Sequence, residues 1–469
     1  MAARWGIITA GEILSALHGE LIGGSREATF AGLSTDSREI IPGSLFLALE
    51  GERFDGHDFI GKAVDKGATG VVMRKGRRPD LPVEKNLVVI TVSDTLKALG
   101  DLAGWWRRQH EVLVAAITGS AGKTTTKEMT ASILGQSWRV LKNKGNFNNL
   151  VGLPLSLFAM EEGHQRAVLE MGMNRPGEIG RLTEIADPDV GLITNVARAH
   201  LEGVGNVMGV AKAKVELLEK MRPEGEVILN GDDDLLMKAA APLGRKVKTY
   251  GMGPGNDITA RKIRSLGRAG FSFEVNHLGK TMEIRLRTPG IQNVSNAIAA
   301  SAVALCLKAL PEHIVQGLGQ FEGLPGRFRV RPLPGGGTLV DDTYNANPFS
   351  LRAALSSLKD LVEESGRILV GLGEMMELED ETVPAHIEAG GMVAELGAHY
   401  FVAMGEHARE MIEGALKKGF PPERADVAAT HDEMAEKLGR LVRKRDLVFL
   451  KGSRRVGLEK VVERLMVKC

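Results

Sequence analysis

The chain contains, at residues 115–126, the sequence Ala115-Ala116-Ile117-Thr118-Gly119-Ser120-Ala121-Gly122-Lys123-Thr124-Thr125-Thr126. An apolar, β-type run at 112–117 precedes the glycines, and the Lys-Thr residues open a predicted helix. Gly119 and Gly122 let the backbone turn its N–H groups toward a ligand, while the helix N-terminus and Lys123 add positive charge. The segment therefore predicts a cradle for a polyphosphate, with the hydroxyl of Thr124 placed to reach a metal ion on those phosphates.

The spacing of this cradle is shorter than that of the standard phosphate-binding loop. Two residues separate Gly119 from Gly122, where the usual loop has four. A glycine-rich turn with a surface lysine is the alternative interpretation, but strand, glycine pair, Lys-Thr and helix follow one another in the order that phosphate binding requires. The motif predicts nucleotide binding, and it does not distinguish a kinase, a motor, a GTPase or a ligase.

The composition is that of a globular chain of 469 residues with 43% hydrophobic side chains, enough for about three domains. Sixty basic and 59 acidic side chains leave a net charge of +1, so no overall field attracts nucleic acid or an anionic membrane. The two cysteines, Cys306 and Cys469, predict no disulfide framework and fit a reducing cytoplasm. We expect no signal peptide, and the weakly polar stretch 297–307 is far shorter than the ~20 residues of a membrane span.

We predict an α/β fold with three domains, at residues 1–110, 111–325 and 326–469. In the central domain strands alternate with helices, which predicts a parallel sheet covered on both faces, with ligands at the carboxyl ends of its strands. The last domain repeats this alternation and is predicted to be Rossmann-like. Its Gly371-Leu372-Gly373 lacks the rest of a dinucleotide-binding motif, so NAD binding is not expected.

Apolar runs and helical periodicity set the expected elements. The strands are 44–49, 69–73, 87–92, 112–117, 167–171, 190–195, 226–230, 258–263, 270–275, 281–286, 338–340, 367–372, 399–403 and 447–450. The helices are 13–17, 60–66, 93–108, 179–185, 207–221 and 297–310, with a further helix from about residue 350.

Polar groups follow several strands of the central domain. An amide-rich loop occupies 143–149, Glu170 ends an apolar strand, and His200 follows the strand that ends at Asn195. Glu170 and His200 could each ligate Mg²⁺, which takes few protein ligands and completes its shell with phosphate oxygens and water. A solvated residue or a helix cap is the alternative for each, and the residues alone leave both interpretations open.

Lys214 lies on the apolar stripe of the predicted helix 207–221, in line with Val210 and Leu217. A charged ammonium is costly in such a place unless it is paired. Burial lowers the pKa of a lysine, and a neutral amine can add carbon dioxide to become a carbamate, an anionic oxygen ligand. The residues alone favour the alternative, a lysine that extends its charged end to solvent.

Four other polar groups could bind a ligand, and for three of them the residues allow a second interpretation. Asn293 and Asn296, near a predicted helix start, are either caps or amides aimed at a base. Residues 34–38 could present hydroxyls and a guanidinium to a ligand, although the residues alone favour an ordinary turn. Arg327, in the predicted linker, could approach a phosphate. The basic turn at 451–455 either binds a carboxylate or has no ligand.

The chain resembles the Mur ligase family from end to end. The shared landmarks are 118–126, Gly145-Asn-Phe-Asn-Asn149, Glu170-Met-Gly-Met173, 195–203, Ala211-Lys-Ala-Lys214 and Asn293-Val-Ser-Asn296. The segments 145–149, 341–348 and 373–378 resemble the dipeptide-adding member in particular. Gln292 stands where the family often has histidine, and Thr343 where serine is common, so the adenine loop is the part in which packing is expected to differ.

This resemblance implies a ligase that joins an amine to a carboxylate through an acyl phosphate made from ATP. The implied substrates are UDP-N-acetylmuramoyl-tripeptide and D-alanyl-D-alanine, and the implied protein is a cytoplasmic monomer without nucleic acid or membrane partners. The implied Mg²⁺ ligands are Thr124 and Glu170 for one ion, and His200 and a carbamylated Lys214 for another. The implied catalytic residues are Lys123, Glu170, His200 and Lys214.

The resemblance also implies the contacts of each substrate. The implied ATP-binding residues are Thr118, Gly119, Ser120, Ala121, Gly122, Lys123, Thr124, Thr125, Asn293, Asn296, Arg327 and Asp342. The implied residues near the UDP-peptide or the dipeptide are Ser34, Thr35, Asp36, Ser37, Arg38, Phe46, Asn148, Asn149, Tyr344 and Asn345, with the segment from Glu374 beside them.

Three alternatives remain at this point. A tripeptide-forming Mur ligase or a folylpolyglutamate synthetase would share the fold, and the segment 341–348 argues against both. A phosphate-loop ATPase that acts as a switch on a partner would hydrolyse ATP without either peptide, and a nucleotide-binding scaffold would give no product. No residue is a convincing general base for the incoming amine.

Overall fold

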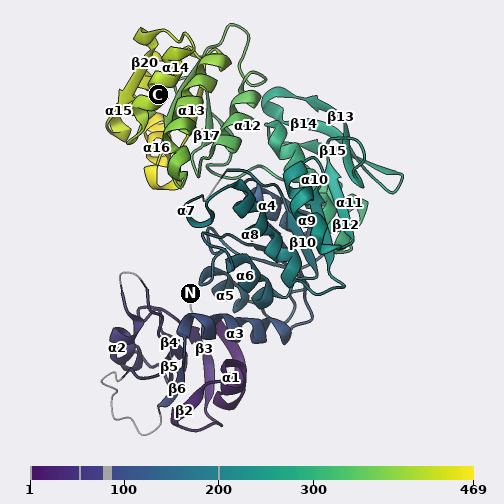
Figure 1. Cartoon of the computed structure of the whole chain (residues 1–469), viewed down its shortest axis with the longest axis vertical. Helices are drawn as coiled ribbons and strands as arrows, with labels where there is room; N and C mark the ends of the chain where they lie inside the picture. The colour runs from purple at the N-terminus through teal and green to yellow at the C-terminus, as the bar shows by residue number, and fades with distance from the viewer. Residues whose placement is uncertain (1–2, 52–53, 78–86, 199–200, 469) are drawn as a thin grey trace.

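The structure is a computed structural model that describes residues 3–51, 54–77, 87–198 and 201–468. Its strands form three sheets, of six, nine and six strands in chain order. Figure 1 shows the three sheets and their helices as successive bodies along the long axis of the molecule, with the first and the last at opposite ends. The predicted three-part α/β organisation is confirmed.

The first sheet has the strand order β1-β3-β4-β5-β6-β2. Its elements are β1 (Ala3–Thr9), α1 (Ala10–Leu17), β2 (Glu20–Gly23), β3 (Thr29–Ser34), β4 (Leu45–Leu47), η1 (Gly56–Phe59), α2 (Ile60–Asp65), β5 (Gly70–Arg74) and β6 (Val88–Val92). The strands β1, β2 and β3 were not expected from the sequence. β2 is short and has no buried residue, so it lacks the apolar run by which the other strands were found.

Helix α3 (Thr95–Arg108) connects the first sheet to the second. It begins at the N-cap Asp94, and its Leu99 and Leu102 are fully buried in a core that also contains Leu153 and Ile185 of the central body. The first two bodies therefore share one hydrophobic core, which fixes their relative orientation.

The central sheet has the order β15-β14-β13-β12-β11-β10-β7-β9-β8. Its strands are β7 (Leu113–Thr118), β8 (Val140–Lys142), β9 (Arg166–Glu170), β10 (Val190–Ile193), β11 (Glu226–Asn230), β12 (Val247–Gly251), β13 (Ile258–Ser265), β14 (Phe271–His277) and β15 (Lys280–Leu286). Pairing is parallel from β8 to β13 and antiparallel from β13 to β15. The parallel part was predicted from the alternation of strands with helices, and the antiparallel part from the alternating residues of β13, β14 and β15. The strands β8 and β12 were not expected.

Helices cover both faces of this sheet. They are α4 (Lys123–Leu134), α5 (Gly152–Leu157), α6 (Glu178–Ala186), α7 (Leu201–Val204), α8 (Val207–Lys220), α9 (Asp234–Ala240), α10 (Ile291–Cys306) and α11 (Pro311–Gly319). Along β7, Val114 and Ala116 join the core on one face, and Ala115 and Ile117 join the core on the other. The strand that leads into the cradle is thus anchored from both sides.

The last sheet has the order β16-β17-β21-β18-β19-β20. Its elements are β16 (Arg329–Pro332), β17 (Thr338–Asp342), α12 (Pro348–Leu358), β18 (Ile368–Gly373), α13 (Thr382–Leu396), β19 (Tyr400–Met404), α14 (Ala408–Lys417), β20 (Ala425–Ala428), α15 (His431–Leu441), β21 (Leu447–Lys451) and α16 (Glu459–Lys468). All strands but β16 run parallel, as predicted. β21 lies between β17 and β18, so the carboxyl ends of these three strands meet.

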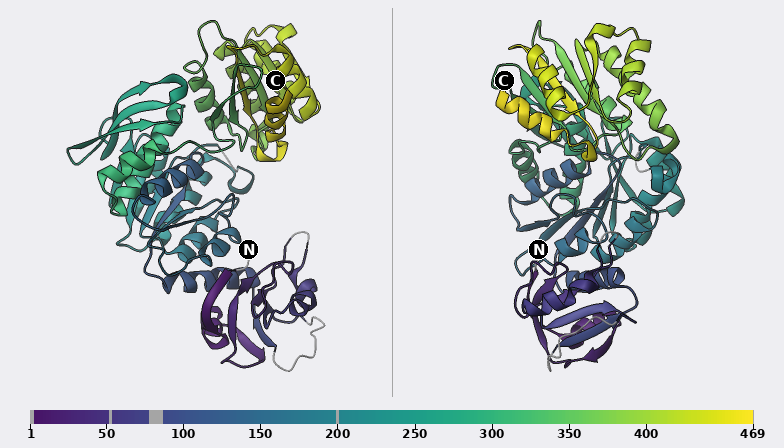
Figure 2. Two further views of the ribbon diagram at one scale, coloured as in Figure 1. Left: turned by 180° about the vertical axis from the view of Figure 1, so that it is seen from behind. Right: turned by 90° about the vertical axis from the view of Figure 1, so that its left-hand side faces the viewer.

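The last body packs against the central body and is away from the first sheet in all three views (Figures 1 and 2). Arg268 of the central body donates to the Leu361 carbonyl and pairs with Glu363 at 2.7 Å. On another side of the contact, Arg198 pairs with Glu381 at 3.1 Å. Within the described ranges, none of the helices has the length and apolar character needed to cross a membrane.

Candidate active site

A cavity of about 910 Å³ lies between the central and last bodies. It is lined by residues that follow strands of both sheets, among them Lys123, Glu170 and Asn195 from the central body and Tyr344 and Arg455 from the last. Ligands of open α/β sheets bind at the carboxyl ends of strands, and here two such edges face one cavity.

The cradle needs its two glycines. Gly119 and Gly122 have φ values of 148° and 81°, which side chains rarely adopt. A Cβ atom at Gly119 would lie 1.9 Å from the Thr194 hydroxyl, and one at Gly122 would lie 2.3 Å from the Asn296 side-chain oxygen. The tight turn predicted from the sequence is therefore present, packed between β10 and α10.

Asn195 braces the cradle, which the sequence did not predict. The N–H groups of Ser120 and Ala121 donate to the backbone and side-chain oxygens of Asn195, at 3.0 and 2.9 Å. The expectation that these two N–H groups point at a phosphate is therefore not met; the first turn of α4, from Lys123, supplies the N–H groups that a helix leaves without partners. Asn195 is the second residue after β10, the neighbour of β7, and its place beyond the end of that strand was the available signal.

Lys123 and Arg327 bring positive charge to the cradle. Lys123 Nζ donates to the Gly119 carbonyl at 2.7 Å, and Arg327 donates to the Thr124 hydroxyl at 2.8 Å. Burial lowers the pKa of Lys123, and the negative charge of Glu170 opposes that effect. The structure thus brings together Lys123, Thr124 and Arg327, three of the residues predicted from the sequence to bind phosphate, the last of them from the linker.

Glu170 is 3% exposed at the end of β9. Its Oε1 accepts from the Asn148 side chain at 2.9 Å, and its backbone N–H donates to Asn143 at 2.9 Å. Its Oε2 is buried and has no hydrogen-bond partner in the described part of the chain. The amide-rich loop therefore holds Glu170 in place and leaves one carboxylate oxygen available.

Lys214 is 1% exposed in α8, so its ammonium does not extend to solvent. It has no hydrogen bond or ion pair to any residue that the structure describes. Burial lowers its pKa well below the usual value, and the charge of Lys123 lowers it further. The interpretation as a solvent-exposed lysine is wrong. His200 lies outside the described residues.

Asn293 and Asn296 lie inside α10 and not at its end. The helix begins at Ile291 with Gly290 as its N-cap, so the interpretation of the two asparagines as caps is wrong. The expected start at 297 was late because polar residues occupy the first turns. The Asn296 amide donates to Asn293 at 3.2 Å, and both residues line the cavity. An adenine contact through them stays a prediction.

Family models match three parts of the chain. They are described as "Mur ligase family, catalytic domain" at residues 29–107, "Mur ligase middle domain" at 117–304 and "Mur ligase, glutamate ligase domain" at 326–454. The chain belongs to the Mur ligase family. The resemblance noted from the sequence motifs is thereby confirmed over most of the chain.

Individual Mur ligases resemble this one over nearly their whole length. The UDP-N-acetylmuramoyl-tripeptide–D-alanyl-D-alanine ligase of Bacillus subtilis is 35% identical, with 93% of each chain covered. The crystal structure of MurF from Acinetobacter baumannii matches with a TM-score of 0.89 at 33% identity, covering 99% of this chain and 100% of that one. MurF from Thermotoga maritima in complex with ADP matches with a TM-score of 0.83 at 27% identity, covering 93% and 97%.

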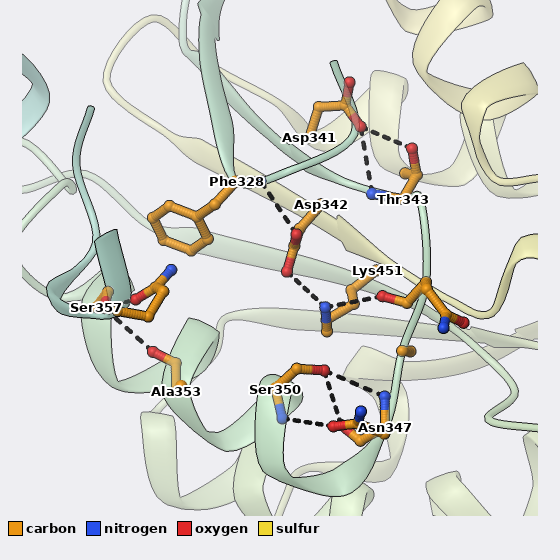
Figure 3. A network of polar contacts seen from close by, with 12 residues as sticks. Phe328, Asp341, Asp342, Thr343, Asn347, Ser350, Ala353, Ser357 and Lys451 are labelled. Carbon is orange, nitrogen blue, oxygen red and sulfur yellow. Dashed lines mark hydrogen bonds and ion pairs between the residues drawn. The ribbon is translucent and has the colours of Figure 1, made fainter. Parts of the chain in front are cut away.

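In this Mur ligase, two adjacent aspartates clamp the linker to the last body, and Figure 3 shows the bonds of Asp342 to Phe328 and Lys451. Asp341 accepts from the Gly326 N–H at 3.1 Å. Asp342 accepts from the Phe328 N–H at 3.0 Å and from Lys451 Nζ at 2.6 Å. Burial raises the pKa of Asp342. Both of its oxygens already bind protein groups, so the implied contact of Asp342 with ribose would have to share them.

Lys451→Ala is expected to lower the free energy of unfolding by about 3 kcal/mol, because it leaves Asp342 as a buried, uncompensated charge. The two side chains are 3% and 13% exposed. Denaturant unfolding measures the loss, with the exposed Lys460→Ala as control. Adding Asp342→Asn should recover part of it, since the stranded charge is then removed. Equal unfolding midpoints for wild type and Lys451→Ala would contradict the pairing.

The implied substrate residues of the first body do not line the cavity. Ser34 and Asp36 bond to each other's polar groups, and the Arg38 guanidinium beside Asp36 lowers the pKa of that carboxyl to about 2. Phe46 is 1% exposed within a hydrophobic cluster. Its implied place near the uridine nucleotide stays a prediction, and in this structure its side chain is part of the core.

Of the remaining implied residues, some line the cavity and others make hydrogen bonds within the protein. Thr118 is fully buried and donates to the Met171 carbonyl, and the side chain of Asn149 caps α5. Asn148, beside Glu170, lines the cavity. Tyr344 lies under the guanidinium of Arg327, with 4.0 Å between the guanidinium carbon and the ring centre. Thr125, Asn149 and Asn345 also line the cavity. Thr35 and Ser37 lie in the first body and do not line it.

Proposed function

We propose that this Mur ligase adds D-alanyl-D-alanine to UDP-N-acetylmuramoyl-tripeptide with hydrolysis of ATP to ADP and phosphate, which gives the UDP-pentapeptide precursor of peptidoglycan. The observation that carries the proposal is the single cavity in which the phosphate cradle faces the strand ends of the last body. The choice of substrates rests on the likeness to ligases of that name over nearly the full chain. The ADP complex of the Thermotoga relative supports ATP as the nucleotide.

In the first step, a carboxylate oxygen of the tripeptide attacks the γ-phosphorus of ATP, the bond to the β-phosphate oxygen breaks, and ADP leaves. Negative charge moves from the γ- to the β-phosphate during this transfer. Lys123, Arg327 and the first-turn N–H groups of α4 stabilise that charge, because their positions are fixed before the reaction begins.

The residues beside the cradle fit Mg²⁺. The free Oε2 of Glu170 and the hydroxyl of Thr124 are hard oxygen donors, and a buried carboxylate oxygen without a partner is costly unless a cation binds it. Thr124 and Glu170 would hold one ion, and Lys214, carbamylated at its neutral amine, would hold a second with His200. Bound Mg²⁺ would neutralise charge on the phosphate oxygens.

In the second step, the amine of D-alanyl-D-alanine attacks the carbonyl carbon of the acyl phosphate, the carbon–oxygen bond breaks, and inorganic phosphate and a proton leave. Closure of the last body over the cavity would restrict water, which would otherwise hydrolyse the acyl phosphate. Arg327 and Tyr344 lie where the two substrates would meet.

Three domains with separate roles complete the proposal. Residues 1–110 would bind the UDP-peptide, residues 111–325 would bind ATP, and residues 326–469 would close on the site. We propose a cytoplasmic monomer.

The test measures phosphate release and product mass in mixtures that omit one substrate at a time. A ligase of this kind releases phosphate only with ATP, Mg²⁺, UDP-tripeptide and dipeptide together, and yields a UDP-pentapeptide. A conformational switch would hydrolyse ATP without either peptide, and a scaffold would give no phosphate in any mixture. Either result would overturn the proposal.

Glu170→Gln should raise the Mg²⁺ concentration needed for half-maximal rate by at least about tenfold, because it removes a metal-binding charge while keeping the shape of the side chain. The hydrogen bond from Asn148 can persist, so the fold should not change. Titration of the rate with Mg²⁺ at saturating substrates gives the value. Glu178→Gln, at the rim of the same cavity, is the matched control. A variant that needs no more Mg²⁺ than wild type would exclude Glu170 as a ligand.

A further inference from the structure

We propose that the basic turn, residues 451–455, binds the terminal carboxylate of the incoming dipeptide, with Arg455 as the residue that contacts it. The inference rests on the proposed function and assigns a binding site to the terminal carboxylate, which is the end of the dipeptide that does not react. Nothing in the reaction chemistry itself involves this carboxylate, so its binding determines which amine donors the enzyme accepts.

The turn occupies the point of the last sheet at which a ligand is expected. It follows β21, which lies between β17 and β18 although β18 comes next after β17 in the chain. At such a change in strand order, the loops beyond the carboxyl ends leave a crevice. The loops after β17, β18 and β21 all contribute to the cavity, through Asn345, Met376 and Arg455.

Ser453 fixes the turn to both neighbouring loops. Its hydroxyl accepts from the Met376 N–H at 3.0 Å, and its own N–H donates to the Glu374 carbonyl at 3.1 Å. Ser453 is 3% exposed. The backbone that carries the next two arginines is therefore held in place, and little freedom is lost when they bind a ligand.

The two arginines of the turn differ in their contacts. Arg454 pairs with Glu459 at 3.1 Å and lies over the Tyr344 ring at 5.5 Å. Arg455 is exposed, lines the cavity, and has no hydrogen-bond or ion-pair partner among the residues described. A guanidinium stays charged at any physiological pH and can bind a carboxylate through two parallel hydrogen bonds. Arg455 is therefore the free cation of the turn.

The length of the dipeptide matches the distance between this turn and the phosphate site. Tyr344 lies between the two: the Arg327 guanidinium carbon is 4.0 Å from the ring centre, and that of Arg454 is 5.5 Å from it. The two guanidinium carbons cannot be farther apart than these distances added together. Two extended residues span at most about 7 Å. A dipeptide whose amine lies beside Arg327 can thus extend to Arg454, and the next residue of the same turn is Arg455, which lines the cavity.

The test compares D-alanyl-D-alanine with D-alanyl-D-alaninamide, which lacks the negative charge, in wild type and Arg455→Ala. With the natural dipeptide, Arg455→Ala should raise the KM for the dipeptide by at least about tenfold and leave kcat and the KM values for ATP and UDP-tripeptide unchanged. With the amide, the two proteins should have the same high KM. Arg455→Lys should fall between them, because it keeps the charge and loses the paired geometry.

The controls separate a failure of this inference from a failure of the proposed function. Arg409→Ala removes an exposed arginine of α14, which does not line the cavity, and should behave as wild type. If wild type makes no UDP-pentapeptide, the proposed function fails. If wild type makes it and Arg455→Ala keeps the wild-type KM for the dipeptide, the inference is overturned. A raised KM for UDP-tripeptide alone would overturn it as well, because the turn would then bind the other peptide.

Discussion

Replacing Lys123 by alanine is expected to reduce kcat/KM for ATP by about 10²–10³-fold, with losses in both affinity and rate. Its ammonium lies at the base of the cradle, 2.7 Å from the Gly119 carbonyl and near Glu170. In the free enzyme it stabilises the turn, and with ATP bound it would face the phosphates whose charge grows during transfer. Both the ground state and the transition state thus depend on it.

Steady-state kinetics with varied ATP measure both losses. Lys280→Ala, an exposed position of β15 in the same body, is the control for loss of one positive charge. Equal kcat and KM values for wild type and Lys123→Ala would refute the assignment of the cradle. A protein that has lost its fold is recognised separately by its thermal unfolding, which Lys123→Ala should leave close to that of wild type.

Lys214→Ala should reduce kcat by at least about 100-fold while the protein stays folded. The Lys214 amine is 1% exposed, and burial lowers its pKa well below the usual value, which favours the neutral form that reacts with carbon dioxide. Its carbamate would supply the anionic oxygen that Mg²⁺ needs. The amine has no ion-pair partner among the described residues, so its removal strands no opposite charge, and a loss of activity is not expected to come from unfolding.

Lys214→Met keeps the length of the side chain without the amine, and it should lose activity to the same extent. Lys220→Ala, at the exposed end of the same helix, should not. Added bicarbonate should not restore either Lys214 variant, and carbon-13 bicarbonate should give a carbamate NMR signal with wild type alone. Full turnover in Lys214→Met would refute the carbamate role.

The features predicted correctly from the sequence are those that local chemistry determines. The cradle was predicted because two glycines, a lysine and a strand-to-helix change are close in the chain. Lys214 was identified as unusual because helical periodicity alone places it on the apolar stripe of α8. The parallel sheets followed from the alternation of apolar runs and helices, which reflects burial on both faces.

The features that were missed depend on contacts between distant segments. Asn195 braces Ser120 and Ala121 from beyond the end of the neighbouring strand β10, and a place after a strand end is a general signal that does not identify those two partners. Phe46 was placed beside a nucleotide by the family resemblance alone, and tertiary packing buries its side chain in a hydrophobic cluster. The start of α10 was predicted late, since asparagines are weak helix formers and only the packing against Gly122 accounts for Asn296 there.

The clamp on the linker has a mechanical consequence. Because Asp341 and Asp342 hold the N–H groups of Gly326 and Phe328, the short segment that carries Arg327 travels as part of the C-terminal lobe. A hinge motion of that lobe would pivot upstream, at Gly323, whose φ of 81° few other residues tolerate. An outward swing of the C-terminal lobe would break the hydrogen bond from Arg327 to Thr124. The guanidinium would then be at the nucleotide site only while the two lobes are docked.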